Sequence, residues 1–152
     1  MKSLALIVFA VLTAIAALHA AWGLKIIWPA ASEQQLVAMV IGAKGRRTMP
    51  PPLQCFVVAA AVLVQGLIAL LAANWIAAPV SRQIVALLAL LCALVFVGRG
   101  IAGFTPGWRA RFPQQPFARL DREYFSPLCL ALGAGFVVLA LYGLGWMSTM
   151  DG

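Results

Sequence analysis

The chain has 152 residues, of which 64% are hydrophobic and only 10% are charged. About a quarter of the residues in a soluble domain are charged, and a core this small could not bury so much apolar surface, so the composition excludes an ordinary soluble fold and indicates a membrane protein. The formal net charge of +7 does not indicate nucleic-acid binding, because the basic residues lie between apolar runs and do not alternate with stacking aromatics.

The three cysteines, Cys55, Cys92 and Cys129, each lie inside an apolar run and form no CxxC pair. Zinc and iron–sulfur sites need clustered thiolates, and a disulfide framework needs paired cysteines near the surface. These cysteines are therefore expected to be small buried hydrophobic residues. Their spacing also argues against a quinone-linked thiol oxidoreductase, and we expect no metal and no cofactor.

Four apolar runs are long enough to cross a bilayer, which takes about 20 residues of helix. They cover residues 4–24, 54–78, 83–104 and 125–147. Each run is rich in Leu, Ala and Val and lacks the alternation of polar and apolar residues that is typical of a barrel strand. The sequence therefore predicts an all-α membrane protein, with residues 1–152 forming a single domain, an antiparallel bundle of four transmembrane helices.

The first run has a second interpretation. A lysine, an apolar stretch and the segment Ala17-Leu18-His19-Ala20 also resemble a signal peptide with a small-residue cleavage site. Cleavage there would leave three spans. The apolar run is longer than that of a usual signal peptide, and His19 and Trp22 lie close to the cut, so we expect a retained span.

The basic residues in the loops predict the orientation of the chain. Most of them lie in the two long loops, as Lys25, Lys44, Arg46, Arg47, Arg109, Arg111, Arg119 and Arg122. The opposite side has only Lys2 and Arg82. Because basic loops are retained in the cytoplasm, both long loops are predicted to be cytoplasmic and both termini to lie outside.

The first long loop is predicted to contain a short helix. Ser32-Glu33-Gln34-Gln35 has the pattern of a capping box, and the apolar residues that follow, as far as Ala43, share one helix face. Such a helix is expected to lie in the membrane interface or against the bundle. The segment Pro50-Pro51-Pro52 then imposes extended backbone before the second span.

Polar residues in apolar spans are costly in lipid, so each is a functional hypothesis. Here they gather on the predicted cytoplasmic side, where Gln54 and Cys55 also open the second span. The candidate ligand-binding residues are His19, Trp22, Arg99, Asp121, Tyr124 and Ser126. No residue is assigned a catalytic role.

These residues predict a pocket in the cytoplasmic leaflet. Arg99 would bind a carboxylate or phosphate group, with Asp121 as its internal counter-charge. His19 is the only histidine, the residue type best suited to proton transfer near neutral pH. Trp22 and Tyr124 would place polar tips above an apolar cavity.

A purely structural interpretation stands beside this one. Arg99 would then extend to the headgroups from a helix end, and Asp121 would hold the third loop against the bundle. His19 would hydrogen-bond a neighbouring helix, and Trp22 would belong to an interfacial aromatic belt.

Three functions remain open. The leading hypothesis is a module that binds an amphipathic, lipid-like ligand by an acidic or polar head. The alternative is a small accessory subunit or assembly factor of a larger membrane complex, or a homo-oligomer, because small residues recur four apart in the spans. The third is a membrane enzyme that uses His19 and Asp121 for proton transfer on a lipid-like substrate. A channel is disfavoured, because the polar residues stop halfway across the membrane.

Glycines near the end of the third span do not form a nucleotide site. The segment Gly98-Arg99-Gly100-Ile101-Ala102-Gly103 has a GxGxxG-like pattern. It follows a membrane helix, whereas a dinucleotide fingerprint follows a β-strand.

Three segments resemble one family of small bacterial membrane proteins, domain-of-unknown-function family 3995. Its first-span signature is similar to Ala17-Leu18-His19-Ala20-Ala21-Trp22-Gly23. Its arginine motif resembles Gly98-Arg99-Gly100-Ile101-Ala102-Gly103-Phe104. Its segment with an aspartate and Tyr-Ser-Pro-Leu-Cys-Leu resembles residues 117–130, where Phe125 stands between Tyr124 and Ser126. The resemblance implies a four-helix protein of the bacterial inner membrane with no assigned activity.

Overall fold

The computed structural model describes residues 1–145. This part of the chain is helical and contains no strand, which confirms the predicted all-α class. The elements are α1 (Lys2–Gly23), α2 (Glu33–Val40), α3 (Pro52–Ala72), α4 (Arg82–Ala102), α5 (Pro106–Arg111), α6 (Phe117–Leu120), the π-helical turn η1 (Asp121–Phe125) and α7 (Ser126–Gly143).

Four helical segments are long and apolar enough to cross a membrane, as predicted. They are α1, α3, α4 and the continuous run α6–η1–α7. Most boundaries of these segments lie close to the predicted residues, and two differ clearly. The second segment ends at Ala72 and not at residue 78, because Asn74 has a positive φ of 54°, which ends the helix. The fourth begins at Phe117 and not at residue 125, and its predicted end at residue 147 lies outside the described residues.

Side-chain caps explain where several helices begin. The Ser32 hydroxyl accepts a hydrogen bond from the Gln35 N–H at 3.2 Å, which confirms the predicted cap of α2. This helix ends at Val40, earlier than predicted, and Gly42 follows in the left-handed region at φ 66°. Thr105 caps α5 in the same way, with its hydroxyl 3.3 Å from the Trp108 N–H.

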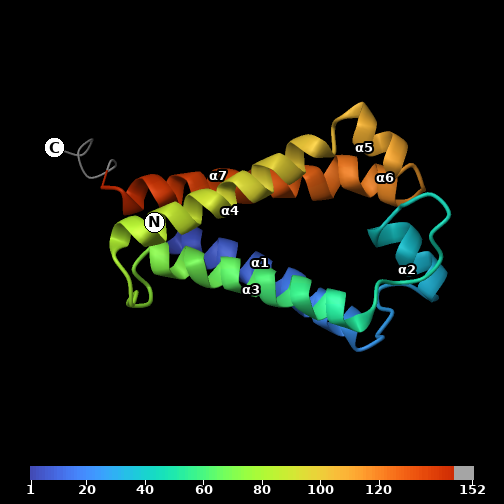
Figure 1. The fold of residues 1–152 in the computed structure, drawn as a ribbon, viewed down its shortest axis with the longest axis horizontal. Coiled ribbons are helices and arrows are strands. Elements are labelled where there is room, and N and C mark those ends of the chain that lie inside the picture. The colour runs from blue at the N-terminus through green and yellow to red at the C-terminus, as the bar shows by residue number, and fades with distance from the viewer. Residues whose placement is uncertain (146–152) are drawn as a thin grey trace.

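The four long segments form two pairs (Figure 1). The chain runs along α1 and returns along α3, then runs along α4 and returns along α7. Glycines allow close packing within each pair. A Cβ on Gly66 would lie 3.1 Å from the Phe9 ring of α1, and a Cβ on Gly133 would lie 2.6 Å from the Val97 side chain of α4.

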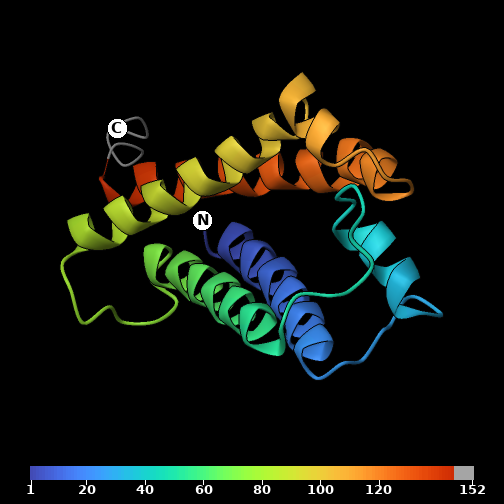
Figure 2. The same cartoon turned by 45° about the vertical axis from the view of Figure 1, so that its right-hand side comes forward.

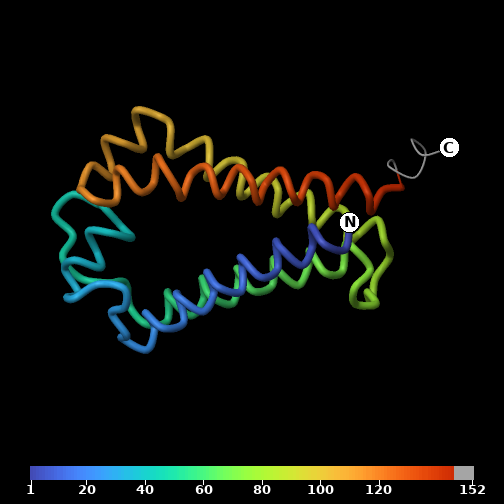
Figure 3. The backbone as a smooth tube through the Cα atoms, turned by 180° about the vertical axis from the view of Figure 1, so that it is seen from behind, coloured from blue at the N-terminus to red at the C-terminus, as the bar shows by residue number. Residues whose placement is uncertain are grey.

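The two pairs pack on each other at one end only, which we call the core end. The buried apolar cluster takes residues from 5–12 of α1, from 69–73 at the end of α3, from 85–96 of α4 and from 132–140 of α7. The Phe96 and Phe136 rings stack there with centroids 5.8 Å apart. Towards the opposite end, which carries α2, α5 and α6 and which we call the loop end, the pairs diverge (Figures 1 and 3).

A contact between the two long loops bridges the loop end. The Gln114 N–H donates a hydrogen bond to the Gly42 carbonyl at 3.2 Å. The ring of Phe117 is buried directly against Gly42, where no side chain would fit. Figure 2 shows this bridge from α2 to the segment that precedes α7. The two helix pairs are therefore also linked at the loop end, through their long loops.

Candidate functional site

Arg99 and Asp121 form an ion pair at the loop end of the α4–α7 pair. Arg99 lies in the last turn of α4, and its Nη2 donates to Asp121 Oδ1. Its Nη1 donates to the Ser126 hydroxyl at 3.3 Å. The Asp121 side chain is only 4% exposed, whereas that of Arg99 is 28% exposed. The permanently charged guanidinium thus neutralises a carboxylate that is shielded from solvent.

Trp108, which was not among the predicted site residues, completes this group. Its indole Nε1 donates to Asp121 Oδ2 at 3.0 Å. The Arg99 guanidinium carbon lies 4.4 Å from the centroid of the same indole ring, which is a cation–π contact. The only sequence feature that could have indicated the position of Trp108 is Thr105-Pro106, which begins α5 and so turns Trp108 towards the end of α4. We call Arg99, Trp108, Asp121 and Ser126 the arginine cluster.

The π-helical turn explains how Asp121 and Ser126 both reach Arg99. Residues five apart in an α-helix point about 140° away from each other. Here the Ser126 N–H bonds to the Asp121 carbonyl, five residues back, so the two side chains lie one turn apart on one face. Pro127 favours this turn because it has no N–H for an α-helical hydrogen bond. The turn contains Phe125, the residue that separates Tyr124 from Ser126.

The glycines near the end of α4 allow the cluster to form. A Cβ on Gly103 would overlap the Ser126 hydroxyl and lie 2.9 Å from Asp121 Oδ2. A Cβ on Gly100 would lie 2.7 Å from the Leu130 side chain. Their GxGxxG-like spacing therefore serves the close approach of α4 to α7.

His19 and Trp22 lie in a second group, on the α1–α3 pair. Their ring centroids are 4.9 Å apart. His19 Nδ1 lies 2.9 Å from the Ile15 carbonyl, which can only accept, so Nδ1 carries the proton of this hydrogen bond. The rings line a hollow of about 170 Å³, together with Val40, Ile41, Met49, Pro50, Gln54, Cys55 and Val58. We call this the histidine hollow.

A family model described as "Protein of unknown function (DUF3995)" matches residues 12–136, which is most of the chain. The chain belongs to DUF3995. The resemblance in the sequence is thus confirmed, and the matched region of this DUF3995 protein includes both the arginine cluster and the histidine hollow. No curated protein and no solved structure matches the chain.

The DUF3995 protein holds the six candidate residues in two groups and one outlier. Arg99, Asp121 and Ser126 meet in the arginine cluster, and His19 and Trp22 meet in the histidine hollow. Tyr124 belongs to neither group, because it is 62% exposed. No hydrogen bond or ion pair joins the two groups within residues 1–145. His19 bonds its own helix and not a neighbouring one.

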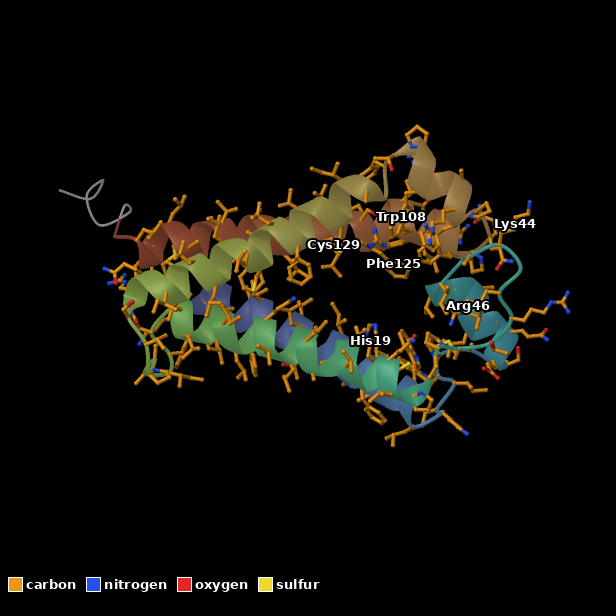
Figure 4. All side chains as sticks on the ribbon, viewed as in Figure 1. His19, Lys44, Arg46, Trp108, Phe125 and Cys129 are labelled. Atoms are coloured by element: carbon orange, nitrogen blue, oxygen red, sulfur yellow. The ribbon has the colours of Figure 1, made fainter. Side chains whose placement is uncertain are left out.

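His19 of the histidine hollow and Trp108 of the arginine cluster lie on facing sides of the two helix pairs. Figure 4 shows His19 on the α1 side at the loop end, with Trp108, Phe125 and Cys129 on the opposite side. Phe125 and Cys129 are half-buried. The facing walls of the two pairs therefore combine apolar surface with one group of polar side chains on each side.

Two polar atoms in the spans of the DUF3995 protein were not among the candidates. Thr13 Oγ1 and Gln65 Oε1 are buried and have no hydrogen-bond partner within residues 1–145. They lie near the middle of α1 and α3. Within residues 1–145, no group of three or more His, Cys, Asp or Glu side chains is arranged so that it could hold a metal ion.

Replacing Trp108 with phenylalanine should lower the free energy of unfolding by about 1.5–3 kcal/mol, the range for a hydrogen bond to a charged group. The ring remains near Arg99, but Asp121 Oδ2 loses its donor. Unfolding in detergent, followed by circular dichroism, measures the change. Trp75→Phe is the matched control, because its indole also donates one hydrogen bond, to the exposed Lys2 carbonyl at 3.0 Å. Equal losses in both variants would contradict a special role for Trp108.

Proposed function

We propose that this DUF3995 protein is a membrane-embedded binding module for an amphipathic, lipid-like ligand. The ligand lies between the two helix pairs at the loop end, with its acidic or polar head near the arginine cluster. One observation carries the proposal: the pairs pack together only at the core end, and polar groups of both walls lie on facing sides at the loop end.

The chemistry of the two walls suits such a ligand. Arg99 commits one N–H of each terminal nitrogen to Asp121 and Ser126, so further N–H groups remain for a ligand. Asp121 already neutralises one positive charge, which favours a polar or singly acidic head over a multiply charged one. His19 donates through Nδ1, which leaves Nε2 for the ligand in the facing wall.

The proposed route to the site is lateral. The contact of Gly42 with Gln114 and Phe117 links the pairs at the loop end, and the apolar cluster fills the core end. A lipid-like molecule can reach the remaining space from the surrounding bilayer. The proposed setting is the cytoplasmic leaflet of the bacterial inner membrane, with both long basic loops inside and both termini outside.

Native mass spectrometry of the protein extracted in a mild detergent tests the proposal. We expect wild type to carry a small-molecule adduct. The paired variant Arg99→Met/Asp121→Leu should lose it, because the polar group that holds the head is gone while no buried charge is left unpaired. His19→Phe in the opposite wall should weaken retention.

The control variant is Arg82→Met, which removes an arginine from the other end of the same helix, where its guanidinium contacts the Tyr142 carbonyl at 2.8 Å. It should keep the adduct. Equal retention by wild type, the paired variant and the control would overturn the proposed binding site.

A second function, as a small subunit or assembly factor, is supported by a hollow on the α1–α3 pair. Thr13, Ala16, Ala17, Ala20, Phe56, Ala59, Ala60 and Leu63 line this hollow of about 420 Å³ on α1 and α3. A partner helix packs well on small residues in lipid. The same extraction discriminates between the two, because a subunit would retain a stoichiometric protein partner and no adduct.

The enzyme alternative has less support. Both carboxylate oxygens of Asp121 accept hydrogen bonds, from Arg99 and Trp108, which leaves Asp121 poorly placed to transfer protons. His19 stands on the opposite helix pair. Unchanged lipid extracts from cells with His19→Ala would exclude proton transfer by this residue.

A further inference from the structure

Three arginines surround an open hollow on the outer side of the loop end. Arg109 belongs to α5, Arg119 to α6 and Arg122 to η1. The hollow has a volume of about 770 Å³, within the range of small-molecule sites. It shares no residue with the arginine cluster or the histidine hollow. We call it the basic hollow.

The positive charge of the basic hollow is largely uncompensated. Among residues 1–145, Glu123 is the single carboxylate that lines it, and its Oε2 lies 4.0 Å from Arg119 Nε. Both side chains are exposed, so this pair is weak. Arg109 and Arg122 donate no hydrogen bond to any group within residues 1–145. Guanidinium groups bind phosphate oxygens in a bidentate manner, which suits this arrangement to a phosphate anion.

The segment that carries the hollow is held in place before any ligand binds. Pro113 and Pro116 form part of its wall and have fixed φ angles. The adjacent Phe117 is buried against Gly42, and the centroid of its ring lies 6.0 Å from the ring centroids of both Phe112 and Phe125. Binding therefore costs little ordering of the backbone.

The position of the hollow indicates where the phosphate comes from. Arg119 and Arg122 lie in the first turns of the segment Phe117–Gly143, which is long and apolar enough to cross a membrane. Tyr124, two residues further on, is exposed and is of the type that lies at the level of the headgroups. From these observations we infer that the basic hollow binds the phosphate of an anionic phospholipid headgroup, separately from the ligand between the helix pairs.

The test compares phosphatidylglycerol with phosphatidylcholine as probes on the full chain in detergent, by lipid titration and native mass spectrometry. Wild type should prefer phosphatidylglycerol. Each arginine near an anionic headgroup contributes about fivefold in affinity, so Arg109→Gln/Arg119→Gln/Arg122→Gln should bind it about one hundredfold more weakly. The single variant Arg109→Gln should lose about fivefold, and it serves alone if the triple variant does not fold.

The matched control removes the same charge from the other long loop, as Lys44→Gln/Arg46→Gln/Arg47→Gln. It should keep most of the preference. Equal losses in the two triple variants would overturn the inference, since net charge alone would then explain binding. A wild type without preference would also overturn it. The inference would also be overturned if millimolar inorganic phosphate bound in the absence of lipid and displaced phosphatidylglycerol, because the ligand would then be a soluble anion.

Discussion

Arg99→Ala should destabilise the protein more than the simultaneous replacement of Arg99 and Asp121 by apolar residues. The Asp121 side chain is 4% exposed, so the single variant leaves a buried carboxylate without its counter-charge. Removing one partner of such a pair costs about 3–5 kcal/mol of unfolding free energy. In Arg99→Met/Asp121→Leu no charge is left, and we expect a loss of about 1 kcal/mol or a small gain.

Thermal or denaturant unfolding in the same detergent measures the stability of wild type, of Arg99→Ala and of the paired variant. We expect wild type to be the most stable, the paired variant to come next and Arg99→Ala to be the least stable. If the single variant were as stable as the paired one, Arg99 would be acting as a headgroup-seeking arginine and not as the partner of Asp121. The same order decides which variant is suitable for ligand experiments, because a destabilised protein would lose an adduct for trivial reasons.

Gly103→Ala should lower the free energy of unfolding by about 3–5 kcal/mol. Gly98→Ala should be neutral or slightly stabilising, although Gly98 lies in α4 only five residues before Gly103, the residue that caps the end of this helix. The added methyl group at Gly103 overlaps the Ser126 hydroxyl and crowds Asp121. Relief requires α4 to move away from α7, which adds overpacking strain to the loss of hydrogen bonds from the arginine cluster. At Gly98 nothing lies within 4 Å of the new Cβ, and alanine is the better helix former.

Unfolding curves of the two alanine variants, recorded side by side, give the difference directly. The stability of Gly100→Ala should fall between those of the other two variants, because its Cβ would lie 2.7 Å from Leu130 and 3.0 Å from the Ser126 carbonyl oxygen, a less severe overlap than at Gly103. Similar stabilities for Gly98→Ala and Gly103→Ala would mean that Gly103 does not lie in close contact with Ser126 and Asp121.

The sequence predicted those features that depend on neighbours along the chain. A bilayer-long apolar run specifies a span by itself, and Ser32 caps α2 through the N–H of Gln35, three residues later. The pairing of Arg99 with Asp121 was also predictable, because an arginine at the end of a span needs a counter-charge and few acidic residues are available.

Features that depend on long-range packing were not predictable. The π-helical turn brings Ser126 to Arg99 and leaves Tyr124 exposed, which a regular helix pattern does not indicate. Trp108 joins the cluster because the fold places α5 beside Asp121 of η1 and Arg99 at the end of α4. His19 and Arg99 lie at the same end in the sequence pattern, but their helices belong to different pairs, and nothing local in the sequence specifies how far those pairs diverge.

The divergence of the helix pairs gives the molecule a wedge-shaped outline across the bilayer. Its cross-section is smallest at the core end and widest at the loop end (Figures 1 and 3). A wedge displaces more lipid from one leaflet than from the other, so it prefers a membrane that curves away on its wide side.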